Sequence, residues 1–219
     1  MNKPRVQGVY AITPTGWPLI ALLDNVEAAL EGGVRWLQYR QKETGTAEDR
    51  VTTASALARL CADHAAHLLI NDDIALAKPL GTALAGCHLG RDDSPLTEAR
   101  ALLGKGAVLG ASCYDRLDMA RLAVEHGADY LAFGAVFASP TKPGAVRAPL
   151  SLFEEARPLG VPLVAIGGIG IDNIAQVVAA GADAVAVVTG LFGERPDAVA
   201  TLRRARALVG AFAATPLKL

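Results

Sequence analysis

The chain contains few cysteines, and those it has are poorly placed for disulfide or metal chemistry. Only 3 of its 219 residues are cysteines. Cys61, Cys87 and Cys113 lie far apart, and no two of them form a Cys-x-x-Cys motif. We therefore expect all three to be small packed side chains in a protein of a reducing, cytoplasmic compartment. The histidines are equally scattered, which argues against a zinc site and favours core or surface roles for each: His64, His67, His88 and His126.

Long apolar runs and a strong net charge are also missing, and both absences limit the partners. No apolar stretch reaches the roughly 18 residues that span a bilayer. The amino-terminal segment MNKPRVQGVYAITPTG lacks the long apolar core and cleavage site of a signal peptide. The formal net charge is −1, so we expect neither nucleic acid nor a membrane as a partner. The sequence leaves open whether the chain is a monomer or a homo-oligomer.

Aromatic residues are scarce at 5%, yet apolar residues make up 52% of the chain. They gather in short runs that alternate with segments of helical spacing, at residues 6–12, 36–40, 67–70, 86–89, 107–112, 130–134, 162–167 and 184–188. Continuous apolar runs of this length are typical of buried parallel strands. We predict a single (β/α)₈ barrel domain over residues 1–219, with an open doubly wound sheet as the alternative.

Local signals indicate where helices begin, end and pack. Capping boxes are expected where Thr46 precedes Asp49 and where Asp115 precedes Asp118. A left-handed residue that closes a helix is expected at three glycines: Gly32, Gly127 and Gly181. The helix that follows Thr46 is expected to bury one face, made of Val51, Ala54, Ala58 and Cys61.

Two acidic clusters each follow an apolar run. Asn71, Asp72 and Asp73 come after the third run, and Arg91–Asp93 come after the fourth. The carboxyl ends of barrel strands meet on one rim, where barrel enzymes bind their ligands, so both clusters should face the same place. Simpler interpretations exist for single residues: Asp73 caps the third helix, and Asp92 is a turn residue.

Other polar residues are expected on the same rim. Alternation along QYRQK places three side chains on one side of the second strand: Gln38, Arg40 and Lys42. Further candidates follow later strands: Ser112, Ser139, Thr141, Lys142 and Thr189. Cations with two carboxylates suit a magnesium diphosphate, and the Gly-rich turns at AIGGIG and VVTG suit a second phosphate. Alternatively, the cations form a solvated strand end and GGIG is only a tight turn. Asp129 and Asp183 fall on the opposite rim, where we expect structural roles.

An ordered set of motifs also resembles a known family. From GVYAITP near residue 8 to roughly residue 200, the chain is similar to the thiamine-phosphate synthases in QYRQK, INDD, HLGRDD, GASCYD, SPTKPGA, AIGGIGIDN and GADAVAVVTGLF. The resemblance implies a (β/α)₈ barrel that joins a pyrimidine-methyl diphosphate to a thiazole phosphate. The products would be thiamine phosphate and diphosphate.

The resemblance implies a role for each matching residue. Diphosphate contacts would come from Gln38 (also near the pyrimidine ring), Arg40, Lys42 and Asn71, and groups on the pyrimidine diphosphate from Ser112 and Lys142. Asp72 and Asp93 would hold Mg²⁺. The thiazole phosphate would meet Ser139, Thr141, Gly168, Val188 and Thr189. Three residues depart from the pattern: Arg91 stands where Gln is usual, Thr189 where Ser is common and Tyr114 where His is frequent.

We expect a dissociative substitution in which Arg40, Lys42, Ser112 and Lys142 act on the departing diphosphate. The loop 138–149 would close over the ligands. Two alternatives stay open: a thiazole tautomerase of the same fold, and a non-catalytic regulatory barrel that binds phosphate ligands. Asp72, Asp93 and Lys142 argue against the tautomerase, as does Tyr114 in place of its expected catalytic His.

Overall fold

Eight parallel strands close into a barrel in the computed structural model, which describes residues 3–41, 45–138 and 146–216. Each strand pairs with its neighbours in sequence, and β1 closes the ring by pairing with β8. The strands are β1 Gly8–Ile12, β2 Trp36–Tyr39, β3 His67–Asn71, β4 Gly86–Leu89, β5 Val108–Tyr114, β6 Tyr130–Gly134, β7 Leu163–Ile166 and β8 Ala184–Val187. The predicted (β/α)₈ fold is confirmed, and the open-sheet alternative is wrong.

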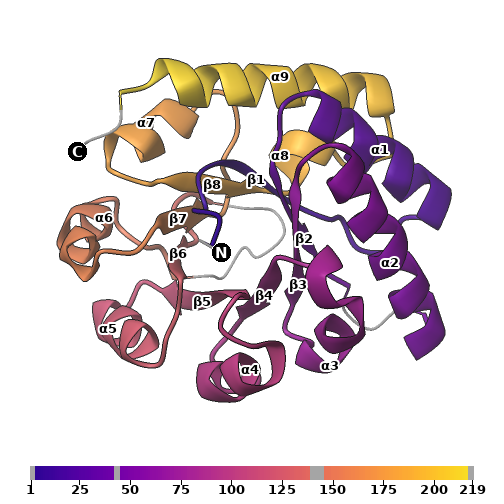
Figure 1. Ribbon diagram of the computed structural model, residues 1–219. Helices are drawn as coiled ribbons and strands as arrows, with labels where there is room; N and C mark the ends of the chain where they lie inside the picture. Colours follow the sequence, from indigo (N-terminus) through magenta and orange to yellow (C-terminus); the bar gives the residue numbers. More distant parts are fainter. Residues whose placement is uncertain (1–2, 42–44, 139–145, 217–219) are drawn as a thin grey trace.

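Helices follow the strands and surround the barrel (Figure 1). They are α1 Leu19–Glu31, α2 Ala47–Asp63, α3 Ile74–Ala77, α4 Leu96–Leu103, α5 Leu117–Glu125, α6 Ser151–Ala156, α7 Ile174–Ala179, α8 Thr189–Phe192 and α9 Ala198–Ala214, with 3₁₀ turns η1 Lys78–Ala83 and η2 Arg157–Leu159. The long α9 packs against α1, so the last helix covers the first βα unit.

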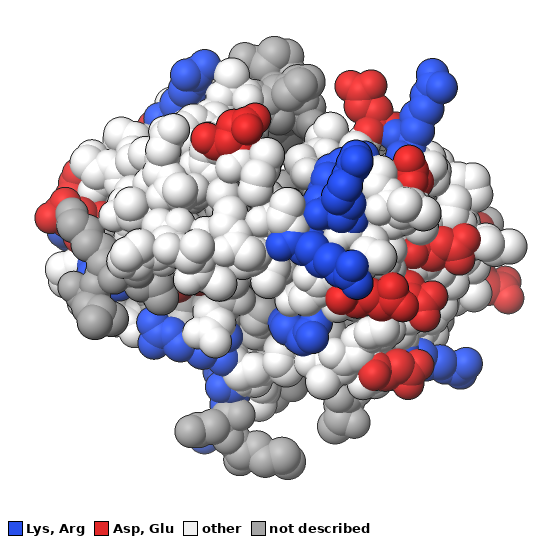
Figure 2. All heavy atoms as spheres, turned by 90° about the horizontal axis from the view of Figure 1, so that it is seen from above, with Lys and Arg blue, Asp and Glu red and all other residues white. Residues whose placement is uncertain are grey.

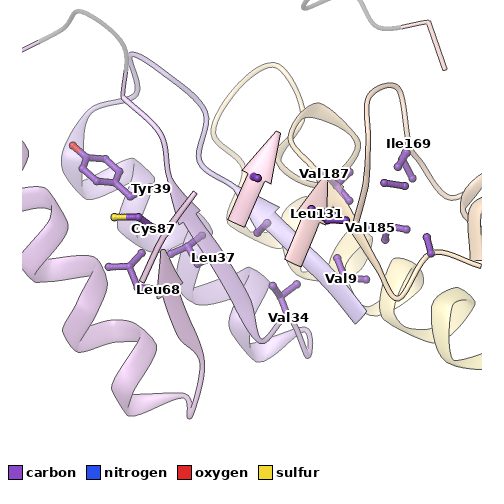
Figure 3. Packing of buried hydrophobic residues seen from close by; sticks show 14 of the residues in the cluster. Val9, Val34, Leu37, Tyr39, Leu68, Cys87, Leu131, Ile169, Val185 and Val187 are labelled. Atoms are coloured by element: carbon purple, nitrogen blue, oxygen red, sulfur yellow. The ribbon is translucent and has the colours of Figure 1, made fainter. Parts of the chain in front are cut away.

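Apolar side chains form two separate layers because alternate strand residues point to opposite faces of the sheet. The outer layer joins the strands to the helices and includes Val9, Leu37, Leu68 and Val185 (Figure 3). The barrel interior contains a smaller cluster: Val6, Tyr10, Ile12, Trp36, Leu69, Val108, Tyr130, Ala132, Val164, Ala184 and Ala186. All three cysteines are buried and unpaired, as predicted.

Several local predictions are confirmed. Thr46 and Asp49 form the expected capping box at the start of α2, where the Asp49 backbone N–H donates to Thr46 Oγ1 over 3.1 Å. Gly127 and Gly181 have φ of 88° and 108°, in the left-handed region that glycine adopts without strain. These residues therefore fix local geometry as the sequence patterns indicated.

Other local predictions are wrong. The left-handed residue after α1 is Gly33, at φ 101°, because Gly32 still has the helical φ of −73°. α5 has no capping box: its N-cap is Arg116, whose guanidinium instead forms an ion pair with Asp118.

The predicted buried face of α2 is wrong at one residue. Leu57 is fully buried on it, whereas Val51 is 41% exposed. Ala54, Ala58 and Cys61 are buried as predicted. Val51 is the fifth residue of the helix and is not part of the core cluster.

The amino-terminal rim is held by two aspartates, as expected for Asp129 and Asp183. Asp129 bonds Lys3 and Arg100, each over 2.6 Å, and also accepts from the Leu109 backbone N–H. Asp183 accepts from the Leu163 backbone N–H over 2.9 Å and pairs with an arginine of the amino-terminal segment, Arg5. Both carboxylates therefore connect the start of the chain to the barrel.

The outer surface carries charges of both signs. On the side of α9, Lys and Arg side chains and Asp and Glu side chains occupy the same face, with uncharged residues between them (Figure 2). Within the described residues, no helix is both long enough and apolar enough to span a bilayer.

Candidate functional site

The cation at the end of β2 is positioned through its backbone. Thr13, which follows β1, is 1% exposed. Its Oγ1 accepts from the Arg40 backbone N–H over 2.9 Å and lies 3.3 Å from the Arg40 carbonyl oxygen, to which it donates. Arg40 is partly exposed, and Gln38 is 2% exposed inside the barrel. Gln38 points into the barrel and Tyr39 packs in the outer layer, as the predicted alternation requires. The same side for Arg40 stays a prediction, and Lys42 lies outside the described residues.

The end of β3 forms a hollow of about 350 Å³. It is lined by Gln41, Arg50, Asn71, Asp72, Asp73, Ile74, Ala75 and Ser94. Asp72 adopts a left-handed φ of 63°, and its backbone N–H donates to the His88 carbonyl oxygen over 2.8 Å. Backbone strain of this kind costs about 1–3 kcal/mol and gathers at functional sites. The turn therefore holds the Asp72 side chain at a strained position on the rim.

Asp73 has the capping role that the sequence indicated. Its Oδ1 accepts from the Leu76 backbone N–H over 2.8 Å at the start of α3, and its Oδ2 pairs with Arg50 over 3.1 Å. Both carboxylate oxygens therefore have partners, which leaves Asp73 poorly suited to bind a metal.

The loop after β4 is shaped by Asp93. Its Oδ2 accepts from the Gly90 backbone N–H over 2.6 Å, and Asp92 is an exposed turn residue beside Arg91. The Arg91 guanidinium carbon lies 5.7 Å from the centroid of the Tyr114 ring, a cation–π contact. Two of the residues that depart from the family pattern therefore contact each other at the rim.

The carboxylates fit a divalent cation only if the ligand supplies further oxygens. No group of three or more His, Cys, Asp or Glu side chains in the described part of the chain is arranged to hold a metal. Mg²⁺ is commonly bound by one or two carboxylates together with water and substrate phosphate oxygens. Asp72 and Asp93 follow adjacent strands and are linked through the β4 backbone, since Asp72 bonds His88 and Asp93 bonds Gly90. This donor set fits a magnesium phosphate better than a free metal ion.

A buried chain of polar side chains crosses the barrel between two of the predicted site residues. Gln38 Nε2 donates to the Tyr10 hydroxyl over 2.7 Å, and that hydroxyl lies 3.0 Å from the Tyr130 hydroxyl. His88 Nδ1 lies 2.8 Å from the Tyr130 hydroxyl, and His88 Nε2 lies 2.9 Å from Ser112 Oγ. Gln38 on β2 and Ser112 on β5 are therefore connected through three buried rings.

Burial keeps the three rings of this hydrogen-bonded row uncharged. Burial lowers the pKa of His88 to about 4, against the opposing influence of the Asp93 charge. Burial also raises the pKa of Tyr10 and of Tyr130 well above the ordinary tyrosine value. The tyrosine hydroxyls and the imidazole are thus neutral at pH 7. Gly110 leaves room for this arrangement, because a β-carbon there would overlap the Tyr130 ring.

The Gly-rich turns after β7 and β8 lie against each other. Gly168 has φ 63°, and a β-carbon there would overlap the Ala138 carbonyl oxygen. Asn173 fixes this turn by accepting from the Gly170 N–H and donating to the Gly168 carbonyl oxygen, both over 2.9 Å. A β-carbon at Gly190 would overlap the Ile169 carbonyl oxygen.

The predicted residues of these turns lie at the mouth of the barrel. Thr189 is exposed at the start of α8, and Val188 packs on the interior cluster. Gly168 is also exposed, on the neighbouring turn. The other predicted residues of the second phosphate site, Ser139 and Thr141, lie outside the described residues, as does Lys142.

Four residues with structural connections to the site were not identified from the sequence: Thr13, Tyr10, His88 and Tyr130. For His88, we predicted only a core or surface role. The sequence did contain a signal for two of them: alternation along GCHL and GVYAI places His88 and Tyr10 toward the barrel interior. A polar side chain at an inward position needs a partner across the barrel.

Comparison with known proteins then decides the family. The family model "Thiamine monophosphate synthase" matches residues 9–191. The chain belongs to this family. A thiamine-phosphate synthase of Chromobacterium violaceum is 53% identical over 211 residues, covering 96% of this chain and 99% of the relative. One of Thioalkalivibrio sulfidiphilus is 53% identical over 206 residues, covering 93% and 96%.

A solved structure agrees with the family. The thiamine phosphate pyrophosphorylase from Pyrococcus furiosus superimposes with a TM-score of 0.79 at 27% identity. The match covers 94% of this chain and 96% of that one. Thiamine-phosphate synthases are transferases, so the family also establishes the class of reaction.

Proposed function

We propose that this chain joins 4-amino-2-methyl-5-(diphosphooxymethyl)pyrimidine to 4-methyl-5-(2-phosphooxyethyl)thiazole, giving thiamine phosphate and diphosphate. The observation that carries the proposal is the placement of Arg40, Asp72, Asp93 and Ser112 at the carboxyl ends of β2–β5 in a member of this family. The expected active site therefore lies on that rim of the barrel. The amino-terminal rim, whose aspartates are paired, holds the fold.

The chemistry requires help for the leaving group more than a nucleophile. When diphosphate departs, the C–O bond to the pyrimidine methylene breaks and both bonding electrons stay with oxygen. The thiazole nitrogen then forms the new C–N bond with its lone pair. Arg40, Lys42 and Lys142 stabilise the negative charge that develops on the diphosphate, and Ser112 and Asn71 donate to its oxygens. Electrostatic help of this kind is commonly worth several kcal/mol.

Asp72 and Asp93 would hold a magnesium ion, which supplies positive charge to the departing diphosphate. Asn71 lies beside Asp72 in the same hollow. Asp73 stays at the start of α3 because its two oxygens are already bonded. The metal ligands would thus be one carboxylate from each of two adjacent strand ends.

The second substrate would bind at the turns after β7 and β8. Gly168 has no side chain, and the Val188 side chain packs inward on the interior cluster, which leaves the backbone N–H groups of these turns and the exposed Thr189 open to a phosphate. Ser139 and Thr141 would add hydroxyl donors. This arrangement places the thiazole phosphate across the barrel mouth from the acidic residues of β3 and β4. The loop 138–149, of which residues 139–145 lie outside the described residues, is proposed to exclude water, which would otherwise trap the electron-poor carbon.

The buried cysteines fit a reducing compartment, and we propose a cytoplasmic enzyme that acts on small molecules. The thiazole tautomerase alternative receives no support at the rim, where Tyr114 occupies the position at which that enzyme's histidine would be expected. A non-catalytic regulatory barrel would not need a magnesium ion.

A magnesium titration with both substrates tests the proposal. Product formation should require Mg²⁺, and Asp72→Asn and Asp93→Asn should each abolish turnover or raise the magnesium needed for half-maximal activity at least about tenfold. The double variant should be little worse than the poorer single one, because both changes disable one site.

Asp73→Asn is the matched control, since it changes the next carboxylate of the same turn, whose two oxygens cap α3 and pair with Arg50. Its magnesium dependence should stay within about twofold of the wild type. Damage by Asp73→Asn with a silent Asp72→Asn would mean that the metal is assigned to the wrong carboxylate. Absence of product from the wild type with both substrates would refute the proposed function.

A further inference from the structure

The hydrogen bonds that connect Gln38 to Ser112 have one donor-to-acceptor direction, which follows from counting the protons along them. The Tyr10 hydroxyl accepts from Gln38 Nε2, and its other partner among the described residues is the Tyr130 hydroxyl. Tyr10 must therefore donate its own proton to Tyr130. The Tyr130 hydroxyl, which now accepts from Tyr10, donates to His88 Nδ1 over 2.8 Å.

The direction continues to the rim. His88 Nδ1 is an acceptor and carries no proton, so the neutral ring has its proton on Nε2. That N–H donates to Ser112 Oγ over 2.9 Å. Because Ser112 Oγ accepts from His88 Nε2, its own hydroxyl proton remains available to a ligand at the rim. A charged imidazolium would not fit, because with two ring donors one of the two tyrosine hydroxyl protons would have no acceptor among the described residues.

We propose that Tyr10, Tyr130 and His88 form a one-way hydrogen-bond relay that fixes Ser112 as a donor toward the ligand and Gln38 as the start of the relay. His88 and the two tyrosines are then positioning residues, which act through Ser112 and Gln38. The inference rests on the proposed function for the identity of the ligand, an anionic phosphate oxygen. The direction of the relay rests on the side-chain geometry alone.

The ligand chemistry independently favours this direction. In the reverse direction Ser112 would donate inward to His88 Nε2, and only its lone pairs would face the ligand. Lone pairs repel an anionic oxygen, whereas a hydroxyl proton forms a charge-assisted hydrogen bond with it. The relay also explains why the bonds are buried: three of its members, Tyr10, Tyr130 and His88, are at most 7% exposed, so water does not scramble their orientation.

The tautomer of His88 tests the relay without substrates. The full chain, labelled with ¹⁵N in its four histidines, gives separate signals for protonated and bare ring nitrogens. The His88 signals are assigned by elimination, by replacing His64, His67 and His126 one at a time. The expected result is a single neutral tautomer with the proton on Nε2 at pH 7. A proton on Nδ1, or an imidazolium, would overturn the proposal.

Tyr130→Phe then breaks the relay at one atom. It removes the donor to His88 Nδ1, so the single tautomer should become a mixture. The KM for the pyrimidine diphosphate should rise, or kcat fall, about tenfold, while the KM for the thiazole phosphate stays within about twofold. Tyr39→Phe is the control for the spectrum, because it removes a buried hydroxyl in the outer layer that bonds Gln41 instead. An unchanged His88 spectrum in Tyr130→Phe would contradict the relay.

These outcomes separate the relay from the proposed reaction. The wrong tautomer overturns the relay and leaves the synthase proposal intact, since the spectrum is recorded without substrates. If the tautomer is correct but no thiamine phosphate forms, the proposed reaction fails and the direction of the relay stands. Cooperative unfolding of Tyr130→Phe in urea, with a midpoint near that of the wild type, shows that the kinetic change does not come from lost fold.

Discussion

The two ends of this barrel both use aspartates, but they surround them differently. On the amino-terminal rim, Asp129 bonds two cations and a backbone N–H. On the carboxyl rim, Asp93 forms no ion pair with the described part of the chain, and its Oδ2 accepts from the Gly90 N–H. Asp72 stands there in a strained left-handed turn. The comparison indicates that surroundings, more than residue type, separate a structural carboxylate from one that is proposed to bind a ligand.

The largest expected effect is on the structural rim. Asp129→Ala would leave Arg100, Lys3 and the Leu109 N–H without their shared acceptor. The Asp129 side chain is 24% exposed, so we expect a loss of about 2–3 kcal/mol in the free energy of unfolding, less than the roughly 3–5 kcal/mol of a fully buried broken pair. Turnover at 25 °C should stay near that of the wild type. Urea unfolding and steady-state kinetics measure the two quantities, and a large loss of turnover without a loss of stability would contradict the division between rims.

The next largest effect is expected on the carboxyl rim, the proposed binding site, where it should lower turnover. Arg40→Ala should lower turnover at least about tenfold, or roughly 1.4 kcal/mol, because the cation is proposed to stabilise the departing diphosphate. Its stability should change by less than about 0.5 kcal/mol, since Arg40 is partly exposed at a strand end.

The matched control for Arg40 lies just before the same strand. Arg35 donates from its Nη1 to the carbonyl oxygens of Leu30 and Val34 over 2.9 and 2.8 Å. Arg35→Ala should therefore reduce stability by about 1 kcal/mol and leave turnover unchanged. If Arg35→Ala and Arg40→Ala gave the same loss of turnover, the assignment of Arg40 to the diphosphate would be wrong.

A smaller effect is expected on the stability of two variants at Asp72. Asp72 adopts φ 63°, where a β-carbon is strained. Asp72→Gly should therefore be more stable than Asp72→Ala by about 1 kcal/mol, since glycine adopts this φ freely. Both variants should lack magnesium-dependent turnover. Equal thermal stability of the two variants would mean that the turn relaxes without the aspartate.

The sequence predicted the barrel well because parallel strands are buried on both faces and appear as uninterrupted apolar runs. The predicted bounds of β5 were the least accurate of the eight strands. It extends to Tyr114, two residues beyond the predicted end, because its pairing with β6 shifts register between Ser112 and Tyr114. Cys113 is buried and Tyr114 is 38% exposed at this irregular end, and regular alternation does not report a register shift.

The candidate site was predictable only where strand order alone brings residues together. Asp72 and Asp93 follow adjacent strands, so their common rim follows from the fold. The contact between His88 and Ser112 also joins neighbouring strands, but its continuation to Tyr130 and Tyr10 crosses the closed interior. Such contacts depend on barrel closure and on the space that Gly110 leaves, which no local pattern reports.

The smallest expected effect concerns Arg91, a cation on the carboxyl rim whose role the sequence left open. It is exposed, contacts the Tyr114 ring and lies 3.4 Å from Asp92. A positive charge near the proposed magnesium ligands opposes metal binding, although solvent screens most of the repulsion. Arg91→Gln should therefore lower the magnesium needed for half-maximal activity by about twofold, or roughly 0.4 kcal/mol, at low salt.

The effect of Arg91→Gln should vanish in high salt, because screening shortens the reach of an exposed charge to a few ångströms. Arg206→Gln is the charge-matched control, on the exposed face of α9, and should not change the magnesium dependence at either salt concentration. Magnesium titrations of the three proteins at two ionic strengths decide the point. An increase in the magnesium requirement of Arg91→Gln would show that Arg91 helps to bind the diphosphate, so that its attraction for the ligand outweighs its repulsion of the metal.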